Sequence, residues 1–167
     1  MKKNKKYFLH ETSIIDQNVK IGNGTKIWHW CQISKNAKIG KNCNLGQNIF
    51  VGQNVKIGDN VKIQNNVSIY KGVELKKNVF VGPSVVFTNI KEPRSFINKK
   101  KKFLKTIISE GATLGANSTI LCGIKIGKFS LVGAGSVCTS STKPFSKVIG
   151  NPARFVGYVN KNGLKLK

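Results

Sequence analysis

The sequence contains few acidic residues, arginines and histidines, and it lacks long apolar runs. Asp and Glu number 6 against 29 Lys and Arg, which gives a formal net charge of +23 at pH 7. The 2 histidines cannot form the three-histidine set that binds zinc in a carbonic anhydrase. Because no apolar run is long enough to span a bilayer and the N-terminus lacks the apolar stretch of a secretory signal, we expect a cytoplasmic protein.

The chain has 4 cysteines and no pair of them is separated by two residues. Cys31, Cys43 and Cys138 fall on inward positions of the pattern described next, so we expect small buried side chains in a reducing compartment. Cys122 falls in a turn, where partial exposure is expected. The lysines are scattered along the chain, with little Arg or exposed aromatic content beside them, so we expect solvated faces and neither a nucleic-acid nor a membrane partner. Their field should attract anionic substrates weakly.

A period of six residues extends from Ser13 to Asn89. A smaller or branched residue stands two places before each aliphatic one, and Asn or Gly often stands three places after it. The aliphatic positions are Ile15, Ile21, Ile27, Ile33, Ile39, Leu45, Val51, Ile57, Ile63, Ile69, Leu75 and Val81. A repeat maintained over this length predicts a repeat architecture.

A period of six fits a short strand that points two side chains inward and then turns a corner. Asn and Gly adopt positive φ most easily, so they indicate the corners. Three such strands form one triangular coil, and residues 18 apart then stack on each other. The sequence therefore predicts an all-β protein, a parallel β-helix that forms a single domain over residues 1–167.

The repeat is interrupted once and then ends before the C-terminus. Phe87 and the next aliphatic series, which includes Leu114, are not separated by a multiple of six, so residues 88–107 are expected to leave the coil as an exposed, extended loop. This segment contains Pro93 and the run Lys99–Lys102. Residues 142–159 are expected to form a capping segment, and the last eight residues are expected to fray.

One corner column carries unusual side chains. His29, Gln47 and Asn65 stack at the predicted interval, with Trp28 and Asn48 beside them. They could form an amide ladder that caps backbone groups, or a binding wall for a ligand or a neighbouring subunit; we favour the wall. The adjacent corner carries Tyr70 and Thr88, from which the loop starts, so the loop is expected to reach the wall.

A second informative corner is predicted around Ala116 and Ala134, which stack with their glycine neighbours. With almost no side chains, its backbone N–H and C=O groups could pair with an extended ligand that contains amides. A tight turn that requires small residues is the alternative.

The residues above carry a family resemblance over about 10–158. The repeat, VGAGSV and VIGNPAR resemble the hexapeptide-repeat acyltransferases. IWHW, LGQNIFVG, KIQNNVSIY, VFVGPSVVFTN, PRS and EGATLGANSTI resemble the nucleotide-sugar 3-amino N-acetyltransferases, above all those acting on UDP-2-acetamido-3-amino-2,3-dideoxyglucuronate in surface-polysaccharide (O-antigen) pathways. This resemblance implies a left-handed β-helix, a homotrimer with sites between subunits, and acetyl-CoA as co-substrate without a metal.

The resemblance also implies roles for individual residues. Asn89 of FTN would lie at the sugar amine, Arg94 would face the anionic part of the nucleotide sugar, and Arg154 would lie at the phosphates of coenzyme A. Gln47, Asn48, Asn65 and Tyr70 are expected to bind the sugar, while Ala116 and Ala134 are expected to bind the coenzyme. Ser140 and Ser141 stand where relatives carry Lys-Asp, so Lys143 or Lys147 is expected to contact the coenzyme instead.

An amine is already nucleophilic when neutral, so orientation by Asn89 is expected to suffice, with the departing thiolate taking the proton. His29 is the alternative general base. A dTDP-3-amino-3,6-dideoxyhexose remains an alternative substrate. A hydroxyl-directed acetyltransferase would be expected to carry a histidine in the loop, and none is present. A non-catalytic trimeric scaffold or a nucleic-acid binder is the alternative from another class.

Overall fold

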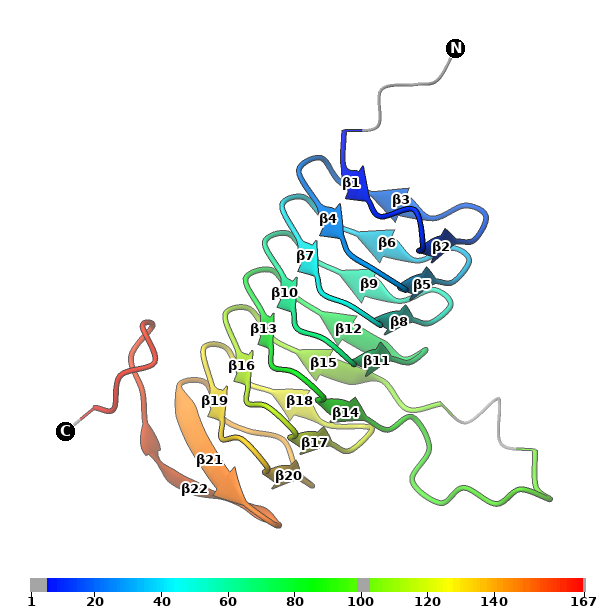
Figure 1. The fold of residues 1–167 in the computed structure, drawn as a ribbon. Helices are drawn as coiled ribbons and strands as arrows, with labels where there is room; N and C mark the ends of the chain where they lie inside the picture. The colour runs from blue at the N-terminus through cyan, green and yellow to red at the C-terminus, as the bar shows by residue number, and fades with distance from the viewer. Residues whose placement is uncertain (1–5, 99–102, 167) are drawn as a thin grey trace.

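The computed structural model describes residues 6–98 and 103–166, which form strands, turns and loops without a helix. The chain winds into stacked three-sided coils, and the strands of successive coils form three parallel sheets (Figure 1). The predicted parallel β-helix is therefore confirmed. Within the described ranges, no helix is long and apolar enough to cross a membrane.

The strands are short, and we name the three sheets A, B and C. Sheet A contains β1 (Phe8–Leu9), β4 (Lys26–Ile27), β7 (Asn44–Leu45), β10 (Lys62–Ile63), β13 (Phe80–Val81), β16 (Thr113–Leu114), β19 (Leu131–Val132), β21 (Ser146–Gly150) and β22 (Ala153–Tyr158). Sheet B contains β2 (Ile14–Ile15), β5 (Gln32–Ile33), β8 (Phe50–Val51), β11 (Ser68–Ile69), β14 (Val86–Phe87), β17 (Thr119–Ile120) and β20 (Val137–Cys138). Sheet C contains β3 (Lys20–Ile21), β6 (Lys38–Ile39), β9 (Lys56–Ile57), β12 (Val73–Leu75), β15 (Thr106–Ile108) and β18 (Lys125–Ile126).

The corners form where the sequence places residues that tolerate positive φ. Asn36, Asn54 and Asn60 have φ values of 61°, 61° and 55°. At the corner from sheet C to sheet A the coils approach so closely that a Cβ on Gly22 would lie 2.5 Å from the carbonyl carbon of Gly40. Glycine is therefore required at this corner by the close approach of two backbones.

The core is the aliphatic column inside the coil. Within most strands one side chain points outward and the next is buried, as predicted from the period. Leu45 and Ile63 are fully enclosed, and Phe87 is the largest of the fully buried side chains. All four cysteines are buried free thiols, and burial raises the pKa of Cys138 to about 11. Cys122 lies in the expected turn but, at 1% exposure, is more deeply buried than expected, and its backbone N–H donates to the Thr88 hydroxyl.

The three faces carry different outward side chains. Sheet C presents a column of lysines, since Lys20, Lys38 and Lys56 are directly opposed across neighbouring strands. No charged side chain points outward from sheet B in the described strands, whose outward residues are Ile14, Gln32, Phe50, Ser68, Val86, Thr119 and Val137. Ile14 is 63% exposed and Val86 is 49% exposed, so sheet B is an uncharged face with exposed apolar side chains in the single chain.

The insert leaves the coil where the repeat is interrupted. Phe80 pairs with Thr113, whereas an uninterrupted repeat would pair it with residue 98. The insert follows β14 and ends before β15, which begins at Thr106, two residues earlier than expected. Residues 91–98 are exposed, and the ribbon extends away from the coil at the corner from sheet B to sheet C (Figure 1). The run Lys99–Lys102 lies outside the described residues.

The C-terminal segment forms a hairpin at the end of the coil. β21 continues sheet A by pairing with β19, and β22 folds back antiparallel to β21. The final residues are more ordered than predicted. Val159 bridges to Lys165, and the Leu166 N–H donates to the Tyr158 carbonyl at 2.9 Å.

Candidate active site

The corner from sheet A to sheet B forms one continuous edge along the coil, which we call the A–B edge. At each corner a backbone N–H donates to a backbone carbonyl of the same corner in the coil before it. These bonds align one residue from each coil in a single column: His29, Gln47, Asn65, Pro83, Ala116 and Ala134. Asn117, for example, donates its N–H to the Pro83 carbonyl at 2.9 Å across the insert. The amide wall and the small-residue corner, which the sequence spacing predicts as separate corners, are therefore two halves of one edge. The insert hid this relation because it lengthens the spacing between the halves.

The amide half of the edge is partly structural. The Asn65 side-chain oxygen accepts the Gln47 backbone N–H at 2.9 Å, and the Asn48 side chain donates to that of Asn66 at 3.1 Å. Asn65 thus caps a backbone group, while Asn48 forms a side-chain ladder with Asn66. Gln47 is exposed and free to turn toward a ligand in the described structure.

An aromatic cluster begins the edge at the N-terminal end. The rings of His10 and His29 are in contact, tilted by 32° with centroids 3.6 Å apart, and the rings of His29 and Trp30 are 5.4 Å apart. The Nδ1 atom of His29 is buried and has no hydrogen-bond partner among the described residues. A catalytic histidine usually has a hydrogen-bond partner that orients its second nitrogen. His29 has no such partner in the described structure, so the geometry does not favour it as a general base.

The insert is fixed to the neighbouring corner, not to the A–B edge. Asn89 is half-buried at its base, where its carbonyl accepts the Leu104 N–H at 3.2 Å. Tyr70 lies at the same corner one coil earlier, beside Phe50. Arg94 is exposed farther out and donates to the carbonyl of Pro93 at 3.0 Å. In one chain, Asn89 therefore lies at a different corner from Gln47, Asn48 and Asn65.

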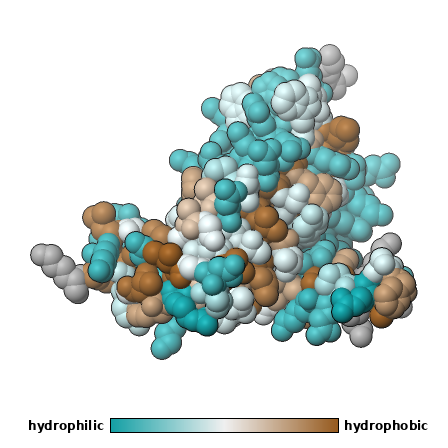
Figure 2. All heavy atoms as spheres, turned by 60° about the horizontal axis from the view of Figure 1, so that its bottom comes forward, coloured by the Kyte–Doolittle hydropathy of each residue, from teal (hydrophilic) through white to brown (hydrophobic). Residues whose placement is uncertain are grey.

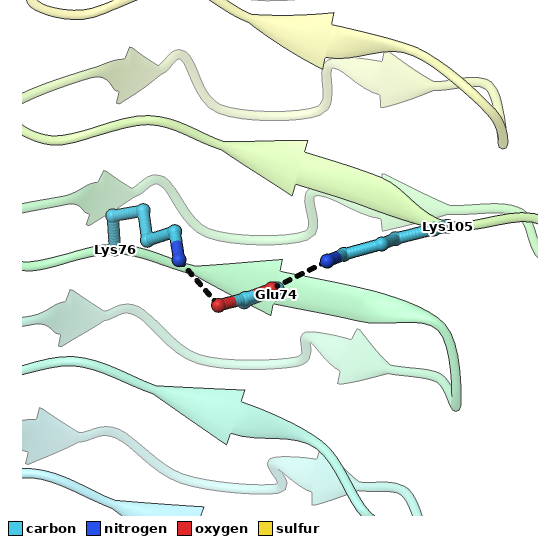
Figure 3. Close-up of polar contacts among 3 residues, drawn as sticks. All are labelled: Glu74, Lys76 and Lys105. Atoms are coloured by element: carbon cyan, nitrogen blue, oxygen red, sulfur yellow. Dashed lines mark hydrogen bonds and ion pairs between the residues drawn. The ribbon is translucent and has the colours of Figure 1, made fainter.

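The carboxylate of Glu74 on sheet C binds the C-terminal end of the insert. Glu74 binds Lys76 of its own coil and, at 3.2 Å, Lys105, which immediately precedes β15 (Figure 3). The hydrogen bond from Lys76 holds the pKa of the Glu74 carboxyl below its usual range; Lys105 adds to this effect and partial burial opposes it. The Glu74 side chain is only 17% exposed, so this pair of contacts is better shielded than most surface ion pairs.

Replacing Glu74 by glutamine is expected to reduce the free energy of unfolding by about 1 kcal/mol at pH 7. A carboxyl whose pKa is lowered by folding contributes stability above its unfolded pKa, about 4.3, and loses that contribution as the pH falls through the folded value. The difference between wild type and Glu74→Gln should therefore vanish in acid. Denaturant unfolding at pH 7 and pH 3 measures it, with Glu110→Gln, which removes a single ion pair to Lys77, as the matched control. If Glu74→Gln lowers the free energy of unfolding equally at both pH values, Glu74 stabilises the fold through packing and not through its charge.

A pocket of about 420 Å³ lies between the end of the coil and the hairpin of β21 and β22. Lys143 and Arg154 both line it, together with the hydroxyl-bearing residues Ser140 and Ser141, so two cations face one hollow. Lys147, the alternative to Lys143, is not among its lining residues. Viewed with the C-terminal end forward, apolar groups gather on the cap at one side and on the insert at the other (Figure 2).

The A–B edge and this pocket meet at β21. The Gly133 N–H donates to the Val148 carbonyl at 2.9 Å, and the Gly150 N–H donates to the Ser136 hydroxyl at 3.1 Å. Val148 also lines the pocket. An extended ligand could therefore lie along the backbone near Ala116 and Ala134 and place an anionic end beside Lys143 and Arg154. Within the described ranges no cluster of three or more His, Cys, Asp or Glu side chains could hold a metal ion.

Two family models match parts of the chain. The hexapeptide repeat of succinyl-transferase matches residues 105–140, and the GMPPB C-terminal domain matches residues 28–92. A curated relative, the dTDP-3-amino-3,6-dideoxy-alpha-D-galactopyranose 3-N-acetyltransferase of Aneurinibacillus thermoaerophilus, is 46% identical over 67 residues, which are 40% of this chain and 35% of the relative. The chain thus matches only about a third of that relative's length.

Solved structures resemble the coil over most of its length. A hexapeptide-repeat-containing acetyltransferase from Vibrio cholerae O1 biovar eltor, complexed with acetyl coenzyme A, is 26% identical, with a TM-score of 0.57 and coverage of 70% of each chain. An N-acyltransferase from Bacillus cereus, in complex with dTDP-4-amino-4,6-dideoxyglucose and coenzyme A, is 21% identical, with a TM-score of 0.59 and coverage of 90% of this chain and 82% of that chain; it supports the fold alone. In its period of six, its three-sided coil and the repeat model that matches residues 105–140, the chain is similar to the hexapeptide-repeat proteins.

Proposed function

We propose that the protein transfers the acetyl group of acetyl-CoA to the 3-amino group of a nucleotide-linked amino sugar for surface-polysaccharide synthesis. The observation that carries this proposal is the 46% identity to a dTDP-3-amino sugar N-acetyltransferase. The similarity to an acetyltransferase that binds acetyl coenzyme A supports the donor. The A–B edge has a polar half, formed by Gln47, Asn48 and Asn65, and a bare half of small residues, formed by Ala116 and Ala134. This geometry supports two substrates that meet end to end.

The bare half of the edge fits the donor. The pantetheine arm of coenzyme A contains amides, which can pair with the backbone near Ala116 and Ala134 where side chains permit close approach. The phosphates would then lie in the pocket with Lys143 and Arg154. Arg154 can bind a phosphate through two parallel hydrogen bonds, and Lys143 supplies a point charge.

The polar half of the edge, with Gln47, Asn48 and Asn65, fits the acceptor. Pro83 marks the boundary between the halves, and it belongs to the coil from which the insert departs. Asn89 and Tyr70 lie at the same level of the coil or one level before it, but at the next corner. A homotrimer resolves the separation, because the insert of one subunit can then reach the A–B edge of its neighbour. The uncharged face of sheet B supports such an interface.

The reaction needs little from the protein beyond orientation. The amine nitrogen attacks the thioester carbonyl carbon, the carbon–sulfur bond breaks, and the coenzyme leaves as a thiolate that takes the proton from the nitrogen. Asn89 would accept a hydrogen bond from the amine and direct its lone pair toward the carbonyl. Arg94 would bind the carboxylate or phosphate of the sugar nucleotide. His29 is the alternative base, although it lacks an orienting partner in the described structure.

Thiol release tests the function and selects the sugar. With acetyl-CoA present, UDP-2-acetamido-3-amino-2,3-dideoxyglucuronate and dTDP-3-amino-3,6-dideoxyglucose are supplied separately. Release with the uronate supports that substrate and makes Arg94 the partner of its carboxylate. Release only with the dTDP sugar, which the similarity to the Aneurinibacillus enzyme favours, keeps the chemistry and changes the substrate. Release with neither, from folded protein that also fails to bind coenzyme A, would contradict the proposal in favour of a scaffold.

A further inference from the structure

One corner position of the A–B edge has a residue that its backbone disfavours. Trp30 has φ of 54°, whereas the equivalent corner residues of the next coils are Asn48, Asn66 and Ser84, with φ of 55°, 61° and 56°. Positive φ brings a Cβ close to the following carbonyl oxygen, and a bulky residue is a true outlier there. Asparagine is the residue that this corner repeatedly uses.

Packing does not explain the tryptophan. Two other bulky residues have positive φ, Phe129 and Phe145, and these rings stack on each other with centroids 5.3 Å apart. Phe129 also lies directly over Gly111. Trp30 is different, because it is 61% exposed and does not belong to the hydrophobic core; its ring lies beside that of His29. A strained residue that the fold does not require is a sign of a functional constraint.

The surroundings of Trp30 indicate the kind of ligand that it could bind. The His29 ring lies 5.4 Å from the Trp30 ring and is itself stacked on the ring of Trp28, which is fixed by a hydrogen bond from its indole nitrogen to Asn44 at 2.8 Å. Trp28 and Trp30 are both exposed, so an indole face is open to solvent on an otherwise polar edge. Such a face binds a flat ring by stacking, and Gln47 one coil further on offers amide hydrogen bonds to the same ligand.

The position of Trp30 along the A–B edge indicates which ring of the ligand stacks on it. Trp30 lies three coils from Pro83, a distance of about 14 Å at the usual spacing between strands. If the amine reacts near Pro83, the group at Trp30 is at the far end of the acceptor, which in a nucleotide sugar is the base. This inference rests on the proposed function and extends it. We propose that Trp30 is the stacking platform for the pyrimidine base of the nucleotide sugar, and that its strained backbone is retained for this contact.

Stacking on Trp30 would also explain why the site residues do not distinguish a UDP-linked sugar from a dTDP-linked one. Uracil and thymine differ by a methyl group on the ring edge, while both present the same flat face. A tryptophan platform therefore accepts UDP and dTDP sugars alike. Discrimination between the two sugars then depends on contacts at the other end of the acceptor, near the insert.

The variant Trp30→Asn separates a binding role from a structural one. Asparagine suits positive φ, so its Tm should equal or exceed that of wild type. The Kd of UDP and of dTDP, measured by calorimetry without acetyl-CoA, should rise roughly 5- to 150-fold, which is the range in affinity that base stacking on an aromatic residue accounts for. KM for the nucleotide sugar should rise in parallel, with KM for acetyl-CoA unchanged. Trp30→Phe, which keeps a ring at this corner, should recover most of the affinity.

Each other outcome has a definite meaning. If wild type releases thiol and Trp30→Asn leaves the nucleotide Kd and KM unchanged, the platform is wrong and the proposed function stands. If Trp30→Asn changes the oligomeric state in sedimentation, Trp30 is an interface residue and the platform is likewise wrong. If wild type binds neither nucleotide and releases no thiol with either sugar, the proposed function fails and the platform fails with it.

Discussion

Replacing Asn89 by alanine is expected to lower kcat for acetylation of the amino sugar about 100-fold, with KM for acetyl-CoA unchanged. The reason is orientation: a reacting group displaced by about 1 Å can lose this much rate when no general base compensates. The base of the insert should survive the change, because its hydrogen bond to Leu104 uses the Asn89 backbone carbonyl. Steady-state thiol release at saturating substrates measures the effect.

Asn23→Ala is the matched control for Asn89. Asn23 is exposed at the corner from sheet C to sheet A, so its loss should leave kcat within about twofold of wild type. A large rise in the KM for the sugar with kcat preserved would mean that Asn89 binds ground state and transition state equally. That result would move the orienting role elsewhere, and His29→Ala would then be the next variant to measure.

Phe87→Ala is expected to reduce the free energy of unfolding by about 3–5 kcal/mol. Phe87 is 1% exposed and is the largest side chain among those fully enclosed by the coil. Because stacked coils cannot easily collapse into the space of a missing ring, most of the cavity should remain. Denaturant unfolding gives the value, and cooperativity should decrease where the coil of β13 and β14 is weakened.

Phe80→Ala provides the comparison within the same coil. Phe80 points outward from sheet A and is 37% exposed, so its removal should cost less than about 1.5 kcal/mol. Equal losses for Phe80 and Phe87 would indicate that burial inside the coil is not the main source of stability. Since Phe87 precedes Thr88 and Asn89, activity assays on Phe87→Ala should be made well below its unfolding temperature.

The coil could be predicted from the sequence because each step of six residues repeats one local solution. Leu45 and Ile63 must be inward, and Asn36 and Asn54 must turn, whatever the rest of the chain does. The cap hairpin was predictable as an end to the repeat, but its pairing was not. The turn at Cys122 was predicted correctly, but its burial was not, because the contacts there involve Thr88, which is distant in sequence.

The site was less predictable, since its parts are related through the insert. Sequence spacing put His29 and Gln47 in one column, yet Ala116 joins that column only after the length of the insert is known. The strain at Trp30 is a dihedral angle, which no residue pattern reports directly. The common pocket of Lys143 and Arg154 depends on the fold of the hairpin. Asn89 and Arg94 were selected by resemblance, and their roles stay predictions.

The insert leaves and rejoins the coil at one corner, and this has an evolutionary consequence. Thr88 and Thr106 fix its ends, and the sheets pair in register on both sides of it. Closing a loop twice as long adds only about 0.6 kcal/mol of entropy, so its length and sequence can change while the coil stays folded. A solenoid of this kind can therefore change the residues that it presents at one corner by exchanging a single segment, while the A–B edge keeps its sequence and structure.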